Sequence, residues 1–193
     1  MAKDNYVVVD IETKNSFFDV GAYDASKLDI SVVGIYVAEE DKFICYDEHE
    51  LDKIWPILER ATRIIGFNII GFDYPVMQKS YHGNLSDLTT LDMLYEFKKT
   101  HNFRIKLDSL AKDTLGTGKS GDGLQAIKYY EEGKIDELKK YCLDDVRITR
   151  DLFLHGRDKG EVYFQDRGSR SVWQVDWKLK DDNVGAGVLT LPF

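Results

Sequence analysis

Carboxylate side chains interrupt apolar segments at three places in this sequence, and the first is YVVVDIET, residues 6–13. Asp10 and Glu12 are two residues apart, so in a β-strand both side chains point to the same face, about 7 Å from one another. Two acids on one face at the end of a buried strand repel each other and lose hydration. Either the strand end reaches solvent, or the pair binds a hard divalent cation such as Mg²⁺ or Mn²⁺.

The second place is the doublet Asp144 and Asp145, which lies in a segment whose apolar residues have helical spacing. At about 100° per residue, the stripe expected to face a core consists of Leu138, Cys142, Thr149, Leu152 and Phe153. Asp145 falls in the middle of this stripe, whereas Asp144 points away from it. A carboxylate aimed at a core is costly unless a metal, a cation or several hydrogen bonds compensate it. Asp145 therefore needs such a partner, and Asp144 is interpreted as a surface charge.

Tyr141 precedes Asp145 by one helical turn and so lies on the same face of the predicted helix. One interpretation is a core tyrosine whose hydroxyl reaches the rim of the core. The other is a side chain that orients an attacking water beside a catalytic acid.

The third place is GFNIIGFDYPVM, residues 66–77, in which Asp73 precedes Pro75 by two residues. Asp73 either caps the start of a helix or adds a fourth acid to the same site, and Asn68 is equally readable as a turn residue. Four carboxylates carry about four negative charges, which two divalent cations would neutralise. Two metal ions roughly 3.5–4 Å apart can hold the attacking and leaving oxygens of a phosphoryl displacement.

These residues require elements to position them, and the apolar patterns predict strands followed by helices. The strands are expected at residues 6–13, 31–38, 42–47 and 63–68. The helices are expected at residues 48–61, near Pro75, and at 93–101, 107–115, 124–132 and 135–156. Pro56 should shorten or kink the first of them. Strands first, with helices interleaved and then dominant, favour an α/β fold with a mixed central β-sheet flanked by helices.

Residues 161–193 differ in kind from the rest of the chain. The segments EVYFQ and SVWQVDWKLK alternate like edge strands, and residues 184–193 have the composition of a loosely ordered tail. We therefore expect one domain over residues 1–160, followed by a β-type appendage or junction over residues 161–193.

The segment LGTGKSGDG, residues 115–123, ends like a phosphate-binding loop but does not fit that motif. Asp113 occupies the position where the motif requires its first glycine, and the segment follows a predicted helix instead of a strand. A glycine-rich connection, with Lys119 near phosphate, is the preferred interpretation.

The composition fits one ordinary globular domain, with 193 residues of which 43% are hydrophobic and 31% charged. A net charge of −8 argues against a general phosphate-backbone binder, although it is compatible with an enzyme whose acids surround metal ions. Cys45 and Cys142 match no zinc spacing, and no membrane span or signal peptide is evident. The expected location is the cytoplasm, with both cysteines reduced.

The segments DIET, GFNIIGFDYPVM and YCLDD resemble, in order and internal spacing, the three motifs of the DEDD 3′–5′ exonucleases. Tyr141 and Asp145, four residues apart, resemble the tyrosine branch of that superfamily. The second motif is similar to the proofreading domain of family B DNA polymerases, and the resemblance covers about residues 6–153. The chain also resembles stand-alone and helicase-associated exonuclease-like proteins.

This resemblance implies a ribonuclease H-like fold and hydrolysis from a 3′ end with two divalent cations, Mg²⁺ or Mn²⁺. The positions that match the metal-binding acids are Asp10, Glu12, Asp73 and Asp145. Tyr141 matches the residue that positions the nucleophilic water. The positions that match the pocket for the terminal nucleotides are Thr13, Asn68 and Phe72.

The expected function is therefore a metal-dependent 3′–5′ exonuclease acting on single-stranded DNA or RNA, with DNA slightly favoured and a helicase or polymerase as a candidate partner. A non-catalytic nucleic-acid-binding module and a ribonuclease H-like endonuclease are the alternatives. Basic residues gather in segments 98–106 and 167–180. They are either solvated surface or a guide for single-stranded nucleic acid, with Trp173 or Trp177 as stacking faces.

Overall fold

The computed structural model describes residues 5–118 and 123–178. Its strands are β1 (Tyr6–Thr13), β2 (Ile30–Val37), β3 (Lys42–Asp47), β4 (Arg63–Gly66), β5 (Thr90–Asp92), β6 (Glu161–Asp166) and β7 (Ser169–Gln174). Its α-helices are α1 (Trp55–Arg60), α2 (Asp73–Met77), α3 (Met93–His101), α4 (Leu107–Leu115), α5 (Gly123–Glu131) and α6 (Ile135–Lys159). Short 3₁₀ turns are η1 (Ala25–Lys27), η2 (Leu51–Lys53), η3 (Gln78–Ser80) and η4 (Leu85–Asp87).

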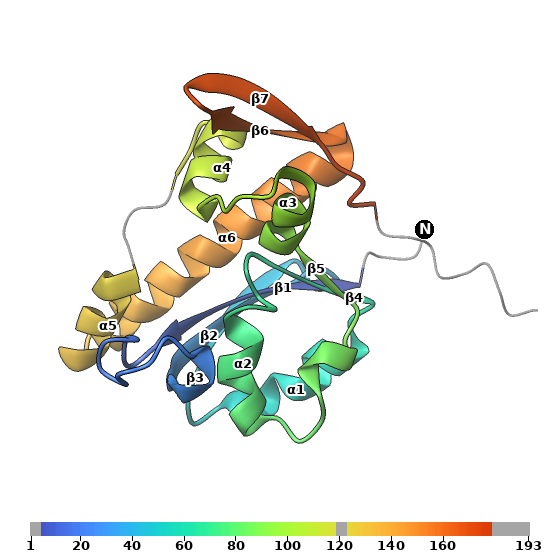
Figure 1. The fold of residues 1–193 in the computed structure, drawn as a ribbon. Coiled ribbons are helices and arrows are strands. Elements are labelled where there is room, and N and C mark those ends of the chain that lie inside the picture. Colours follow the sequence, from blue (N-terminus) through green and yellow to red (C-terminus); the bar gives the residue numbers. More distant parts are fainter. Residues whose placement is uncertain (1–4, 119–122, 179–193) are drawn as a thin grey trace, which may run out of the picture.

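The first five strands form one sheet in the order β3-β2-β1-β4-β5. β1 lies in its centre, antiparallel to β2 and parallel to β4, and β4 is parallel to β5. Figure 1 shows the long helix α6 crossing one side of this sheet and α1 and α2 lying on the other. The predicted α/β fold, a mixed sheet flanked by helices, is confirmed.

The side chains of β1 point alternately to the two faces of the sheet. Val7, Val9 and Ile11 belong to the core cluster that includes residues of α1 and α2. Tyr6 and Val8 belong to the cluster on the α6 side, where the Tyr6 and Phe153 rings are 5.0 Å apart. Because side chains alternate along a strand, Asp10 and Glu12 continue the Tyr6–Val8 face and point toward α6.

The predicted helix over residues 48–61 is shorter than expected and begins at Trp55. Pro56 lies in its first turn, the position where the missing N–H of proline leaves no helical hydrogen bond unmade. The predicted strand over residues 63–68 also ends early, at Gly66, because Asn68 adopts a left-handed backbone conformation with φ of 68°. The edge strand β5 is absent from the sequence-based prediction.

The hairpin of β6 and β7 packs against the rest of the described chain through its apolar side chains. Phe164, Trp173 and Trp177 are buried in the same cluster as Phe97 of α3 and Phe153 of α6. Trp173 is 4% exposed and Trp177 is 3% exposed, so the interpretation of these rings as stacking faces for nucleic acid is wrong. The expectations of a phosphate contact by Lys119 and of a loosely ordered tail at residues 184–193 concern positions outside the described residues.

Candidate active site

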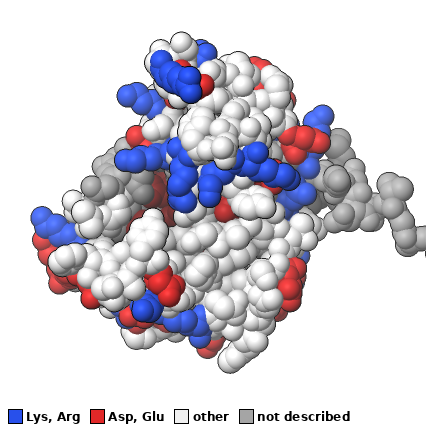
Figure 2. Space-filling model, viewed as in Figure 1, with Lys and Arg blue, Asp and Glu red and all other residues white. Residues whose placement is uncertain are grey.

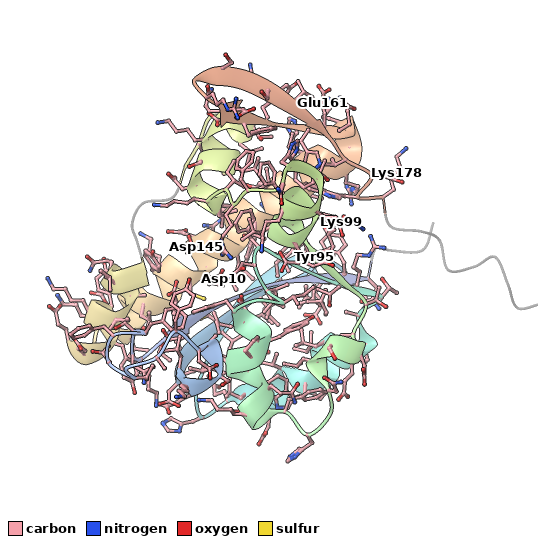
Figure 3. The ribbon with its side chains drawn as sticks, in the orientation of Figure 1. Asp10, Tyr95, Lys99, Asp145, Glu161 and Lys178 are labelled. Carbon is pink, nitrogen blue, oxygen red and sulfur yellow. The ribbon has the colours of Figure 1, made fainter. Side chains whose placement is uncertain are left out.

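Three of the four predicted acids meet where α6 crosses the end of β1. Asp10, Glu12 and Asp145 each offer a carboxylate oxygen, and these oxygens all lie within 4.8 Å of one another. Figure 3 shows Asp10 and Asp145 side by side, one from the sheet and one from α6. Glu12 and Asp145 are buried, at 7% and 3% exposed, and Asp10 is partly buried. This proximity of like charges, largely removed from water, favours the binding of a cation.

A close approach between β2 and α6 brings the acids together. Gly34 of β2 is paired with Asp10 of β1. A Cβ atom at position 34 would lie 2.8 Å from the Cys142 Sγ and 2.9 Å from the Val146 Cγ2, both on α6. The Cys142 thiol also donates to the Asp10 carbonyl at 3.5 Å. The absence of a side chain at Gly34 therefore lets the helix lie against the sheet beside Asp145.

Asp73, the first residue of α2, approaches the site from the other side and is 5% exposed. Burial, with the nearby charge of Asp92, raises the pKa of Asp73 to about 7, and backbone hydrogen bonds from its own amide and that of Ile11 act in the opposite direction. Asp73 is outside the group of three acids whose oxygens lie within 4.8 Å of one another, but all four acids line one cleft of about 350 Å³.

Asp144 differs from Asp145 as the helical pattern predicts. Its side chain is 37% exposed and pairs with Arg147 one turn along the helix. The five apolar-stripe residues predicted to face the core are all buried: Leu138, Cys142, Thr149, Leu152 and Phe153. The assignment of Asp145 to the buried face is confirmed.

The three predicted substrate-contacting residues, Thr13, Asn68 and Phe72, all line the same cleft as the acids. A register shift between Glu12 and Thr13 ends the regular pairing of β1 with β2 at this point, as β-bulges often do beside functional sites. Asn68 accepts a hydrogen bond from the Arg104 Nη2 at 3.3 Å, and the Phe72 ring packs against Phe17.

Tyr141 lies one helical turn before Asp145 but is not among the residues that line the cleft. It is 7% exposed and belongs to an apolar cluster with Val32, Leu138 and Cys142. Its ring centroid is 6.4 Å from that of Tyr129, on the helix α5 that borders the cleft.

Asp92 is a buried acid that sequence reasoning missed. Its carboxylate accepts hydrogen bonds from the backbone N–H groups of Asn68, Ile70, Leu94 and Tyr95 at 2.8–3.1 Å. One side chain thus caps α3 and fixes the turn that carries Asn68. The sequence signal was an aspartate directly before a helix, in TLDMLY, although only the fold brings the Asn68 turn to it.

Cys45 and Cys142, far apart in sequence, lie next to one another, and both are free. A hydrogen bond with Cys45, burial, and the charges of Asp10 and Glu12 raise the pKa of the Cys142 thiol well above its ordinary value. Cys142 is buried beneath the site and is not part of the group of three clustered acids.

The donor set fits a hard divalent cation. Carboxylate oxygens are the ligands that Mg²⁺ and Mn²⁺ prefer, and the three clustered acids carry no soft sulfur or imidazole competitor in their group. With a cation bound, such a site can activate water and stabilise charge that develops on a phosphodiester.

Comparisons with known proteins agree with this architecture. A model of the RNase H superfamily matches residues 8–155, which is more than half of the chain. The fold is also similar to a structure of the family B DNA polymerase from the hyperthermophilic archaeon Pyrobaculum calidifontis, with a TM-score of 0.60 and 17% sequence identity. That match covers 82% of this chain and 24% of the polymerase chain. No curated protein matches the sequence.

The chain belongs to the RNase H superfamily. It has the ribonuclease H-like α/β fold and a cluster of acids that could bind a divalent metal. It spans about a quarter of the polymerase that it resembles, so the likeness to that structure concerns the fold. No helix of the described residues is long and apolar enough to span a bilayer.

Proposed function

We propose that this protein is a metal-dependent 3′–5′ exonuclease that hydrolyses single-stranded nucleic acid, with DNA slightly favoured over RNA. The observation that supports this most strongly is the convergence of Asp10, Glu12 and Asp145 within 4.8 Å in a cleft that Asp73 also lines. The order and spacing of the three motifs that contain these acids favour the tyrosine branch of the DEDD exonucleases.

Asp10, Glu12, Asp73 and Asp145 would hold two divalent cations, Mg²⁺ or Mn²⁺. When bound, the cations supply an activated water and stabilise the charge on the scissile phosphate and the leaving oxygen. The fold fixes the positions of the metal-binding carboxylates, because Glu12, Asp73 and Asp145 are buried side chains on β1, α2 and α6. Partial burial also strengthens their interactions with charge relative to those in water.

Tyr141 has the proposed role of positioning the attacking water. Its placement one turn before Asp145 on α6 supports this role. The role requires the Tyr141 hydroxyl to reach the cleft past the Tyr129 ring of α5. Thr13, Asn68 and Phe72 would contact the terminal nucleotides, since they line the same cleft as the acids. A helicase or polymerase that supplies 3′ ends is the kind of partner that fits this activity.

The direct test uses strands labelled at the 5′ end. The protein is incubated with single-stranded DNA and RNA in Mg²⁺ or Mn²⁺, with EDTA as the control. A ladder that shortens from the 3′ end and disappears in EDTA supports the proposal. Internal cuts would assign an endonuclease, and an intact strand that remains bound would assign a non-catalytic binding module.

A further inference from the structure

A second pocket adjoins the acidic cleft and has a different chemical character. Its volume is about 220 Å³, and its walls come from the segment around η1, the turn after β4, and α3 with the loop that follows. We propose that this aromatic groove, defined by Tyr23, Ile70, Tyr95, Lys98 and Arg104, binds the single-stranded nucleic acid on the 5′ side of the terminal nucleotides. This inference rests on the proposed exonuclease function.

The groove is continuous with the acidic cleft. Phe17, Asn68 and Phe72 line both pockets, so a strand that leaves the cleft past these residues enters the groove directly. Arg104 stands at the junction and donates to the Asn68 Oδ1 at 3.3 Å. Its guanidinium is exposed and retains N–H donors for a phosphate oxygen.

The walls of the groove offer exposed flat rings. Tyr23 is 89% exposed and Tyr95 is 54% exposed, whereas most large apolar side chains of the described chain are buried. The Tyr23 ring is supported from one side by Phe17, at 4.5 Å between centroids. A ring held in this way leaves one face available to a nucleobase, and the exposed Tyr95 ring offers a second stacking surface. Base–aromatic stacking is tolerant of sequence.

Positive charge accompanies these rings. Lys98 and Arg104 line the groove and form no ion pair with any residue that the structure describes, in contrast to Arg147, Arg150 and Arg157 on α6. Figure 2 shows a band of Lys and Arg side chains across the middle of this face, at the height of α3, above a largely uncharged surface. Figure 3 shows Tyr95 and Lys99 on α3.

The described residues of the acidic cleft itself supply no positive charge to contact the phosphates of the strand. No Lys or Arg occurs among the described residues that line it, and its α5 side presents Gly123, Leu124 and Ile127. Among the described residues, a polyanionic strand that leaves the acids past Asn68 and Phe72 therefore meets its first cations in the groove. Asp92, on the groove floor, is buried and already accepts four backbone hydrogen bonds, which compensate its charge.

The test measures binding without chemistry. Fluorescence anisotropy with labelled twelve-nucleotide strands of dT and rU, in EDTA at several salt concentrations, gives the dissociation constant and its salt dependence. We expect Tyr95→Ala to weaken binding about tenfold, because one stacked base contributes about 1–3 kcal/mol, and Tyr95→Phe to bind as the unmodified protein does. The double variant Lys98→Ala/Arg104→Ala should make the fall of log affinity with log salt less steep by about 1.4, at about 0.7 per phosphate contact.

Lys42→Ala is the control for the loss of one exposed positive charge outside the groove, since Lys42 is exposed on β3 at the opposite edge of the sheet. Unchanged affinity and slope in the groove variants, equal losses in Lys42→Ala, or no binding of either strand by the unmodified protein would each overturn the inference.

A second measurement separates this inference from the proposed function. With Mn²⁺, Tyr95→Ala should lower the ratio of kcat/KM for the twelve-nucleotide strand to that for a dinucleotide, because a dinucleotide is too short to fill both the cleft and the groove. Hydrolysis by the unmodified protein with no change in this ratio would reject the groove alone. Groove-dependent binding without any hydrolysis would reject the exonuclease and leave the groove in place.

Discussion

Gly34 and Cys142 lie so close that a Cβ atom at position 34 would be 2.8 Å from the Cys142 Sγ. This contact sets the separation between the central sheet and α6 at the point where Asp10 pairs with Gly34. Because Asp145 follows Cys142 by less than one turn of α6, the same contact determines how near Asp145 comes to Asp10 and Glu12.

Gly34→Ala should therefore disturb the site without altering any acid. The added methyl group must displace Cys142 and Val146, and such overpacking typically costs about 1–3 kcal/mol of unfolding free energy. We expect weaker Mn²⁺ binding by calorimetry as well, since α6 carries Asp145 away from β1. Adding Cys142→Ala to Gly34→Ala should restore part of both losses. Strictly additive effects of the two changes would contradict the proposed contact.

Asp144 and Asp145 should differ sharply despite being neighbours. Asp145→Asn is expected to remove the increase in melting temperature that Mn²⁺ gives the unmodified protein, because a ligand that binds only the folded state stabilises it. Asp144→Asn breaks an exposed pair with Arg147, which is worth about 0–1 kcal/mol, and should keep the Mn²⁺ effect. Thermal melts with and without Mn²⁺ compare the two variants, and equal loss in both would show that the helical assignment is wrong.

Asp92 should act as a positioning residue for the Asn68 turn. Asp92→Ala removes the acceptor of four backbone N–H groups and should cost about 2–4 kcal/mol of unfolding free energy. Asp92→Asn keeps one acceptor oxygen and loses mainly the Ile70 contact, so we expect a smaller loss. In the proposed reaction both variants should raise KM more than they lower kcat. Denaturant titration tests the expected order of stability, and steady-state kinetics tests the effect on KM and kcat. An Asp92→Asn variant less stable than Asp92→Ala would contradict the prediction.

His101 should make stability fall at mildly acidic pH. Burial among Phe97, Phe164 and Trp173 lowers the pKa of His101 below its ordinary value of 6.5. The folded state then binds fewer protons than the unfolded state, so stability is present above pH 6.5 and is lost as pH falls toward the lower folded-state pKa. His101→Phe should flatten this part of the profile of unfolding free energy against pH. An unchanged profile would show that His101 titrates equally in both states.

The sequence predicts the parts of this structure that depend on local periodicity. Alternation along β1 places Asp10 and Glu12 on one face, and the helical spacing around Asp145 predicts that this side chain is buried. Both patterns follow directly from backbone geometry. Asp73 has no such pattern: its residue type left a helix cap and a fourth acid of the site open, and the resemblance of its motif favoured the site.

Features that depend on tertiary contacts were missed or misread. β5 is three residues long and cannot show a period of two, and it is recognisable only by its pairing with β4. Trp173 and Trp177 occur in a charged, alternating segment typical of an edge strand, yet packing against α3 and α6 buries them. The ring contact between Tyr141 and Tyr129 of α5 is likewise tertiary, and the helical pattern around Tyr141 does not predict it.

The most direct test of the central claim is anomalous diffraction from a crystal of the protein grown with Mn²⁺. We predict two peaks about 3.5–4 Å apart, coordinated by Asp10, Glu12, Asp145 and Asp73, and the loss of both peaks in Asp145→Asn. Peaks elsewhere on the surface, or an empty cleft at saturating Mn²⁺, would contradict the assignment of these acids to a metal centre.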